Sequence, residues 1–267
     1  MDYSSIPKNI RSKILKMAFT AQAGHIASSL STADILAVLY FGILKVDPKG
    51  YLDNNRDRFI LSKGHSVMAL YAALAEKGFF SEEELKNYCK VASKMPGHST
   101  RNSVPGVEVT TGSLGHGLPI ACGMALNGKL DSEDYKVFVL MGDGEMDEGT
   151  TWEASLFASH HKLDNLTLIV DYNKLQLLGR TNEVLNLEPF HSKLECLGWS
   201  VVQVDGHNHS EIEAVLSKVP FELDKPSCII AHTVKGKGIS FMENRLEWHD
   251  KKLSEEDYQK CLRELEN

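Results

Sequence analysis

Two stretches of this sequence carry residue types suited to holding a cation and a phosphate group: Gly142-Asp143-Gly144 and, after a spacer, Asn173. Glycines on both sides of an acid let the backbone turn sharply and approach a ligand closely, and the carboxylate is a hard oxygen ligand. The amide oxygen of Asn173 adds a second such ligand for Mg²⁺ or Ca²⁺. Because a cation with so few protein ligands completes its octahedron with phosphate oxygens, the pair predicts a magnesium diphosphate site.

Two other interpretations of the glycine-rich stretches fail on spacing. In an EF-hand loop that began at Asp143, the sixth position would be Glu148 instead of glycine and the twelfth would be Ala154 instead of glutamate. Gly236-Lys237-Gly238 lacks the GxxxxGK[ST] spacing of a P-loop. A Gly-Asp-Gly by itself is most often a simple turn, so the site hypothesis depends on its pairing with Asn173.

The scaffold that must position these residues is predicted to be a parallel sheet. Five short runs are nearly continuous in Val, Ile, Leu and Phe, as strands covered on both faces are: Arg58–Leu61, Lys136–Met141, Leu166–Val170, Val201–Val204 and Ser227–Ala231. Helical patterns lie between them at Val67–Glu76, His116–Asn127, Thr150–His160 and Glu211–Leu216. This alternation predicts an α/β fold, a doubly wound and mostly parallel sheet with helices on both faces. No linker or repeat interrupts it, so residues 1–267 are expected to form a single domain.

Helices are also predicted outside the alternating region. The first, with Ser5 as its cap and Gly24 as its stop, has apolar residues at helical spacing, and a second covers Ser31–Leu44. A short charged helix is expected within Lys251–Asn267. Tyr88–Gly117 is expected to be a long irregular loop, and such loops are often functional.

Ligands of open parallel sheets bind beyond the carboxyl ends of the strands, so the residues that follow each apolar run are the ones that can build a site. Four of these positions are polar: Ser62-Lys63-Gly64-His65, Gly142-Asp143-Gly144-Glu145, Asp171-Tyr172-Asn173, and the stretch from His232 to Gly238. We expect these four segments to meet at one rim of the sheet.

Composition and charge exclude several classes of protein. The chain has 267 residues, of which 42% are hydrophobic and 24% charged, as in ordinary globular domains. With 29 basic and 36 acidic residues the net charge is −7, so nucleic acid is not an expected partner. The 5 cysteines form no metal-binding pair, and the sequence has no signal peptide and no membrane-length apolar run. We therefore expect a cytoplasmic protein without a membrane partner.

The stretch from Gly142 to Asn173 resembles the thiamine diphosphate motif, which begins GDG and ends NN after a similar spacer. Within that group the sequence is most similar to transketolases. The segments that carry this likeness are Gly24-His25, Leu61-Ser62-Lys63-Gly64-His65, Pro96-Gly97-His98, Thr111-Gly112-Ser113-Leu114-Gly115-His116-Gly117, Glu148-Gly149, Glu153-Ala154-Ser155, His161-Lys162-Leu163 and Asp171-Tyr172-Asn173-Lys174. The likeness runs from residue 24 to about residue 249, which is nearly the whole chain.

The resemblance implies a role for each matching residue. The divalent cation, Mg²⁺ or Ca²⁺, would be held by Asp143, Asn173 and the main-chain carbonyl of Leu175. Thiamine diphosphate would contact His65, Gly112, Leu114, Gly144 and His249. The catalytic residues would be His25, His65, His98 and His249. These match the substrate-channel histidines of the family, which bind donor hydroxyls and transfer protons, as imidazole does near neutral pH.

Other residues depart from the family pattern or have two interpretations. Tyr172 replaces the first Asn or Asp at the end of the motif, which is expected to alter packing but not ligation, and His116 stands where many relatives have Gln. Glu148 and Glu153 form either a solvated helix face or, by the resemblance, part of a subunit contact. The residues after His25 lack the Pro-Gly pattern of many long transketolases, which favours a short, split branch. The remaining histidines considered are expected to lie at the surface or beside the site: His160, His161, His191, His207 and His209.

A full-length transketolase also has a pyrimidine-binding α/β domain and a C-terminal domain, and neither is expected in this chain. The resemblance therefore implies the diphosphate-binding subunit of a split enzyme, inactive alone and assembled with a second subunit, two copies of each. Such an enzyme transfers a two-carbon ketol unit from a ketose or ketose phosphate to an aldose. The alternatives are a subunit of another thiamine diphosphate enzyme, similar to 1-deoxyxylulose-5-phosphate synthase or a 2-oxoacid dehydrogenase, and a cofactor-binding subunit without catalysis.

Overall fold

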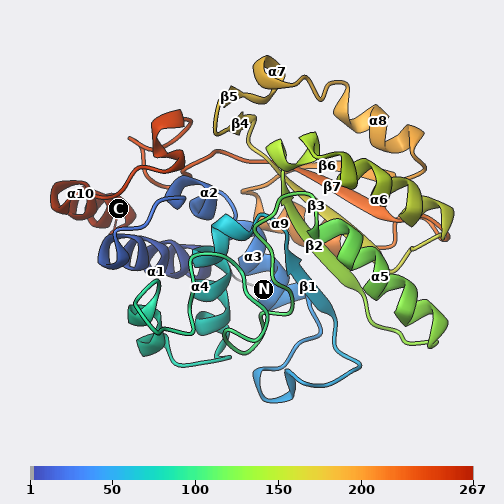
Figure 1. The fold of residues 1–267 in the computed structure, drawn as a ribbon, viewed down its shortest axis with the longest axis horizontal. Coiled ribbons are helices and arrows are strands. Elements are labelled where there is room, and N and C mark those ends of the chain that lie inside the picture. The colour runs from blue at the N-terminus through green and yellow to red at the C-terminus, as the bar shows by residue number, and fades with distance from the viewer. Residues whose placement is uncertain (1–2, 267) are drawn as a thin grey trace.

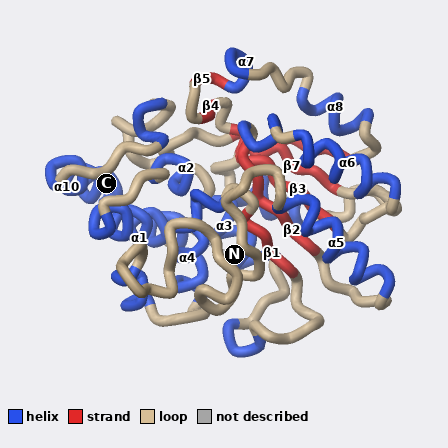
Figure 2. The backbone as a smooth tube through the Cα atoms, in the orientation of Figure 1, coloured by secondary structure: helices blue, strands red, loops and turns tan. Residues whose placement is uncertain are grey.

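A five-stranded parallel sheet forms the centre of the computed structural model, which describes residues 3–266 (Figure 1, Figure 2). Its strands are β1 (Arg58–Leu61), β2 (Val137–Gly142), β3 (Leu166–Tyr172), β6 (Ser200–Asp205) and β7 (Ser227–His232). They lie in the order β1-β2-β3-β7-β6, and every neighbouring pair is parallel. A separate antiparallel hairpin is formed by β4 (Leu175–Gln176) and β5 (Gly179–Arg180).

Helices cover both faces of this sheet, and each face has its own hydrophobic core (Figure 1). One core contains Phe138 and Leu140 of β2 together with α1 (Ile6–Ala21), α2 (Ile26–Leu30), α3 (Ala33–Val38), α4 (Val67–Lys77) and α9 (His209–Leu216). The other contains Val137, Val139 and Met141 together with α5 (Gly117–Leu130), α6 (Gly149–His160) and α8 (Phe190–Cys196). Alternate residues of one strand thus enter opposite cores. The predicted doubly wound α/β fold is confirmed.

The connections change face where β3 and β7 lie side by side. α6 and α8 follow β2 and β3 on one face of the sheet, whereas α9 links β6 to β7 on the other. Strand β7 returns between β3 and β6. This change of face lies at the carboxyl ends of β3 and β7, and such switch points are where open α/β sheets bind their ligands.

The remaining elements are short. They are the helical turns η1 (Leu39–Ile43), η2 (Pro48–Gly50), η3 (Gly64–Ser66), η4 (Glu82–Asn87), η5 (Gly144–Asp147) and η6 (Leu246–His249), and the helices α7 (Thr181–Val184) and α10 (Glu255–Glu266). The charged C-terminal helix is thus confirmed over Glu255–Glu266, while Asn267 lies outside the described residues. Between Tyr88 and His116 the described chain forms no helix or strand, as predicted.

The helix predicted over Ser31–Leu44 is confirmed to within two residues, since α3 and η1 together cover Ala33–Ile43. A short helix that was not predicted, α2, precedes it, and the helical path is interrupted between Leu30 and Ala33. There the hydroxyls of Ser31 and Thr32 donate hydrogen bonds to the carbonyls of Ser28 and Ser29, both at 3.0 Å, so the side chains compete with the helical backbone. The path then widens into a π-helical turn at η1.

The N-terminal helical path is also apolar. Among the described residues, Ile26–Ile43 is the one helical stretch that has the length and composition to cross a membrane, and 83% of it is buried inside the fold. Residues of α2 and α3 in this stretch belong to the core on one face of the sheet. Packing within the protein therefore accounts for its apolar character.

Candidate functional site

Asp143 follows the end of β2, and Asn173 follows the end of β3, so both predicted cation ligands lie at the same edge of the sheet. Gly142 pairs with Asp171 in the parallel register, so the chain leaves both strands at the same level. The buried carboxylate of Asp143 accepts a hydrogen bond from the backbone N–H of Gly144 at 2.8 Å and another from Lys174. The two loops are also linked by a 2.9 Å hydrogen bond from Gln176 to Asp147.

The third predicted ligand, the carbonyl of Leu175, lies on the same loop. The Asn173 Oδ1 accepts from the Leu175 N–H at 3.1 Å, and the Leu175 carbonyl accepts from the Lys235 ammonium at 2.9 Å. Lys235 is buried and comes from the segment that follows β7. Its Nζ also donates to the His249 Nδ1 at 3.0 Å. A single lysine therefore links the predicted cation ligands to the predicted catalytic histidines.

The electrostatics of this rim favour bound charge. Burial raises the pKa of Asp143 to about 7, and the charge of Asp171 adds to the rise, although hydrogen bonds from Lys174 and Gly144 oppose it. Burial, followed by repulsion from Lys63, lowers the pKa of Lys235 to about 8. Because burial makes Asp143 costly to ionise, a bound cation would stabilise its charged form. Each of its carboxylate oxygens accepts one backbone hydrogen bond and keeps a lone pair for a cation. The set of carboxylate, amide and carbonyl oxygens fits Mg²⁺ or Ca²⁺.

The described residues contain no group of three or more histidine, cysteine or acidic side chains that could hold a metal ion by themselves. The predicted set has a single carboxylate, that of Asp143. A cation bound there therefore needs further oxygen ligands, which phosphate groups supply.

The four predicted catalytic histidines gather in one cluster. The ring centroid of His25 lies 5.1 Å from that of His65, 6.1 Å from that of His98 and 5.5 Å from that of His249. The His65 and His249 rings are stacked at 6.0 Å. These residues come from segments that are far apart in the sequence, so the cluster is a product of the fold. They lie beside Lys235, next to the candidate cation site.

His25, His65 and His249 of this cluster are held in their neutral form. Burial lowers the pKa of His25, although the charge of Asp250 opposes this. Burial and the neighbouring Lys63 hold the pKa of His65 well below its usual range. Burial and Lys235 lower the pKa of His249 to about 3. Neutral imidazole can both donate and accept a hydrogen bond, which is the state required to bind hydroxyl groups and to accept a proton.

His25 has the least usual conformation in the cluster. Its φ is +59°, in the left-handed region, and its backbone N–H donates to the His249 carbonyl at 3.0 Å. Its Nδ1 is buried without a hydrogen-bond partner. A strained residue with an unpartnered ring nitrogen inside a polar cluster is typical of a group that awaits a ligand.

The predicted cofactor contacts on the long loop also lie near this cluster. Gly112 has φ +142°, and a β-carbon there would come within 3.0 Å of the His98 ring, so a close approach requires glycine. Leu114 is half-buried on the same loop, and its carbonyl lies 3.0 Å from Nδ1 of the exposed His116. Gly144 begins η5, where a β-carbon would lie 2.8 Å from the Gln176 side chain.

Sequence reasoning missed three buried charged residues that hold the rim together. The Lys63 ammonium pairs with the Asp171 carboxylate and donates to the Ser28 carbonyl at 3.0 Å. The Glu145 carboxylate accepts from Ser62 at 2.5 Å and from the Gly115 N–H at 3.0 Å, so it ties the long loop to the end of β1. All three residues lie in the polar segments that follow the predicted strands. This position in the sequence was the signal that could have identified them.

Residues with two interpretations are placed as follows. Glu148 and Glu153 are exposed at the start of α6, so the described chain gives them no partner side chain that would decide between the two interpretations. Tyr172 is buried and donates its hydroxyl hydrogen bond to Glu188. Histidines 160 and 161 are exposed at the end of α6, and His191 pairs with Glu195 at 3.2 Å. The last two of the five histidines, His207 and His209, contact the buried Asp34.

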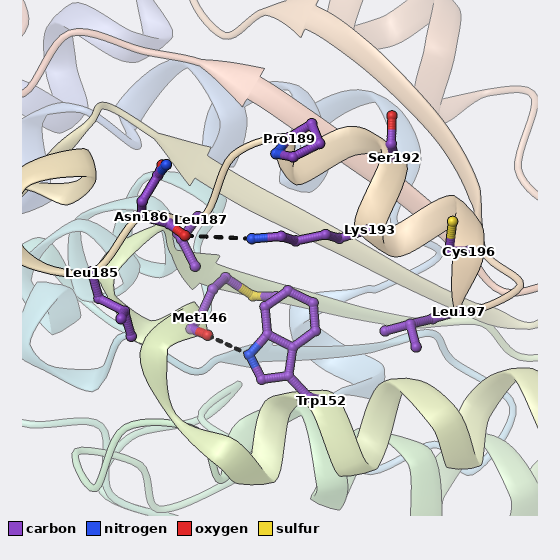
Figure 3. Close-up of a pocket in the computed structure, with 10 residues that line it drawn as sticks. All are labelled: Met146, Trp152, Leu185, Asn186, Leu187, Pro189, Ser192, Lys193, Cys196 and Leu197. Atoms are coloured by element: carbon purple, nitrogen blue, oxygen red, sulfur yellow. Dashed lines mark hydrogen bonds between the residues drawn. The ribbon is translucent and has the colours of Figure 1, made fainter.

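A separate pocket of about 550 Å³ lies between α6 and the segment that leads into α8 (Figure 3). Figure 3 shows the Trp152 indole donating to the Met146 carbonyl, a 2.8 Å bond, at the floor of this pocket. Its lining is mostly apolar and contains none of the predicted catalytic, cofactor or metal residues. The pocket is therefore distinct from the candidate active site.

A doubly wound sheet with an acid, an amide and lysines at its carboxyl ends is typical of α/β domains that bind a phosphorylated ligand there. The comparison with known proteins specifies the group. Residues 4–265 match the family described as transketolase, thiamine diphosphate binding domain. The chain belongs to the transketolase family, and its domain is of the thiamine diphosphate-binding type.

Relatives of similar length are named as transketolase subunits. An apulose-4-phosphate transketolase subunit from Phocaeicola vulgatus is 42% identical over 255 residues, covering 96% of this chain and 90% of that protein. A 6-deoxy-6-sulfo-D-fructose transketolase subunit from a Clostridium species is 44% identical over 243 residues, covering 91% of this chain and 88% of that protein.

Solved structures give the same assignment. The transketolase from Leishmania mexicana superposes with a TM-score of 0.93 at 28% identity, over 100% of this chain and 42% of that one. The chain thus corresponds to less than half of a full-length transketolase. These matches favour a transketolase-type transferase over the alternative thiamine diphosphate enzymes.

Proposed function

We propose that this chain is the diphosphate-binding subunit of a split transketolase, with Asp143, Asn173 and the Leu175 carbonyl holding Mg²⁺ or Ca²⁺. The observation that carries the proposal is the position of Lys235. Its ammonium contacts the Leu175 carbonyl at 2.9 Å and His249 at 3.0 Å, so the candidate cation site and the histidine cluster are adjacent. A diphosphate bound between them would meet both a cation and a lysine.

The chain's own residues would bind, orient and move protons. Thiamine diphosphate, when bound, supplies the electron sink for breaking and forming a carbon–carbon bond beside a carbonyl. His25, His65 and His249 have lowered pKa values and are neutral at physiological pH, and together with His98 they would hydrogen-bond the hydroxyls of a ketose and move protons. Among them, His25 has a buried Nδ1 that lacks a hydrogen-bond partner in the described structure.

The proposal includes a second subunit that carries the pyrimidine-binding domain, in an assembly of two copies of each chain. Outward residues of α5 and α6 support a partner on this face, since Ile120, Leu156 and Phe157 are 37%, 56% and 40% exposed. Apolar side chains that lie exposed on neighbouring helices are typical of a protein interface. Glu148 and Glu153, exposed at the start of α6, would then lie at this subunit contact.

The substrate and compartment belong to the same proposal. The named relatives act on apulose 4-phosphate and on 6-deoxy-6-sulfo-D-fructose, both of which are ketoses that carry an anion. We therefore propose a donor of this kind, a sugar phosphate or a related anionic ketose, with an aldose acceptor. All five cysteines are free thiols, which supports a reducing compartment such as the cytoplasm.

The experiment uses the chain together with a second subunit, for which the product of the adjacent reading frame is the candidate. Ketol transfer should require both chains, thiamine diphosphate and a divalent cation. Asp143→Ala should abolish cofactor binding in calorimetry, a larger loss than the roughly 10- to 100-fold typical of outer partners of a metal site. Asp224→Asn, at an exposed carboxylate that pairs with Lys162, is the control and should bind normally. Cofactor binding retained by Asp143→Ala would overturn the assigned site.

A further inference from the structure

A second charged cluster, centred on Asp34 of α3, lies outside the catalytic rim. The Asp34 carboxylate is 4% exposed and accepts hydrogen bonds from Arg11 at 2.5 Å, His207 at 2.7 Å and His209 at 2.8 Å. None of these four residues contacts the predicted cation ligands in the described structure. Burying a carboxylate costs free energy unless it is paired, and here the pairing is complete.

Two members of this cluster also hold the segment that follows β7. The His207 Nε2 accepts a hydrogen bond from the Val234 N–H at 2.8 Å, and the Arg11 Nε donates to the Lys237 carbonyl at 3.0 Å. Val234 and Lys237 flank Lys235 in the sequence, so the turn that carries this lysine is held on both sides.

The hydrogen bonds of His207 specify a single protonation state. Because its Nε2 accepts from a backbone N–H, the ring proton lies on Nδ1 and is donated to Asp34. Asp34 therefore orients His207 as an acceptor toward Val234. The same carboxylate pairs with the Arg11 guanidinium and so fixes the second contact as well.

The backbone of the turn is shaped to fit these contacts. Gly238 has φ +93°, and a β-carbon there would lie 3.1 Å from the Arg11 side chain. Gly236 has φ +83°, and its N–H donates to the Ala27 carbonyl at 2.9 Å. The left-handed conformations and the close approach of Arg11 together require glycine at these two positions.

We propose that Asp34, acting through His207 and Arg11, is a positioning residue that fixes the Lys235 turn so that the lysine ammonium faces the diphosphate. This inference rests on the proposed function. None of the three residues touches the reacting atoms. Their effect reaches the site through Val234, Lys237 and then Lys235, whose ammonium lies 2.9 Å from the Leu175 carbonyl.

The test measures binding of inorganic pyrophosphate with Mg²⁺ to the full chain, and of thiamine diphosphate with Mg²⁺ to the reconstituted enzyme, by calorimetry. His207→Ala should weaken both by roughly 10- to 100-fold, as loss of an outer positioning group does. His207→Gln keeps an acceptor near the position of Nε2 and should lose less affinity. His209→Ala is the matched control, because His209 bonds the same carboxylate but makes no hydrogen bond to the turn in the described residues. It should change affinity by less than about twofold.

A double-mutant cycle separates positioning from general stability. In the Lys235→Met background, His207→Ala should have little further effect on pyrophosphate affinity, since the group it positions is gone. An undiminished loss in that background, or an equal loss from His209→Ala, would show a merely structural role and overturn the inference. If the wild-type chain and enzyme bind neither probe, the proposed function itself fails. If they bind and Lys235→Met binds equally well, only the inference fails.

Discussion

At the residue scale, the buried ion pair of Lys63 and Asp171 makes the stability of the rim sensitive to the loss of either charge. Asp171 is fully buried, and it also accepts hydrogen bonds from Ser31 at 2.7 Å and from Thr233. Burial alone would raise the pKa of Asp171, but the charge and hydrogen bond of Lys63 hold it below its usual value. Removing one partner of such a pair leaves an uncompensated charge in the interior.

Lys63→Met should therefore lower the free energy of unfolding by about 3–5 kcal/mol, measured by urea denaturation of the free chain. The matched control is Lys162→Met, which breaks an ion pair with Asp224 whose side chains are 62% and 63% exposed. Because water screens that pair, its loss should cost less than about 1 kcal/mol. Equal losses in the two variants would contradict the assignment of Lys63 as a buried structural charge.

The neutral histidines make a second prediction at this scale, which concerns pH. The pKa of His65 is held well below its usual value in the folded chain, first by burial and then by Lys63. As the pH falls below about 6.5, the unfolded chain takes up a proton that the folded chain does not, so stability falls. The contribution is about 1.4 kcal/mol per pH unit for one such histidine.

Urea denaturation at about pH 7, 6 and 5 should show this dependence in the wild type and a shallower one in His65→Gln. The difference in slope should approach one proton, because Gln does not titrate. Above about pH 7 the two curves should run parallel, because the histidine is neutral in both the folded and the unfolded state there. Parallel pH profiles for the two proteins would show that His65 is protonated as readily in the folded chain as in the unfolded one.

At the element scale, the part of the long loop that carries Gly112 and Leu114 is fixed by contacts on either side of these two residues. The Thr111 hydroxyl donates to the Leu61 carbonyl at 2.7 Å, and the Gly115 N–H donates to Glu145 at 3.0 Å. The loop therefore has no regular secondary structure and is nevertheless anchored to β1 and to η5. Its geometry depends on these anchors rather than on local propensity.

Gly115→Ala should disturb this loop and Gly123→Ala should not. Gly115 has φ +81°, and a β-carbon there would lie 2.5 Å from Thr150 Oγ1, so the substitution should cost about 1–3 kcal/mol. Gly123 lies within α5 with nothing within 4 Å, so alanine there should stabilise the free chain by about 0.5–1 kcal/mol. Thermal unfolding of the two variants and proteolysis of the loop measure the contrast. A Gly115→Ala protein as stable as the wild type would show that the loop anchor tolerates a side chain.

How far the sequence predicts these elements depends on how local their causes are. Strand bounds were predicted to within two residues, because continuous apolar runs mark strands buried on both faces. The helix predicted over Ser31–Leu44 is present over Ala33–Ile43, but periodicity does not reveal the break before it, where hydroxyl groups of Ser31 and Thr32 compete with the backbone. Asp143 and Asn173 can be proposed from spacing, whereas the partners of Lys63 and Lys235 lie on distant segments and need the three-dimensional fold.

At the scale of the whole molecule, the surface over α5 and α6 exposes large apolar side chains. The core below α5 and α6 is closed, yet the outer sides of these helices present Ile120, Leu156 and Phe157 to solvent. Scattered exposed apolar residues are ordinary, but three on two adjacent helices beside the candidate site suit an interface. The chain matches 42% of the transketolase from Leishmania mexicana, so the greater part of that protein has no counterpart in this chain.

Leu156→Glu should separate assembly from folding. Leu156 is 56% exposed, so placing a charge there should change the stability of the free chain by less than about 0.5 kcal/mol. If a second subunit covers α6, the buried charge should weaken its binding by at least about tenfold, measured by calorimetry or by the elution volume of the mixture. Leu223→Glu is the matched control, because Leu223 is 82% exposed and lies outside α5 and α6. Pyrophosphate binding by the free chain should be unchanged in both variants. A loss of assembly in Leu156→Glu alone would therefore locate the subunit contact on α6. Equal assembly by the two variants would place the contact elsewhere.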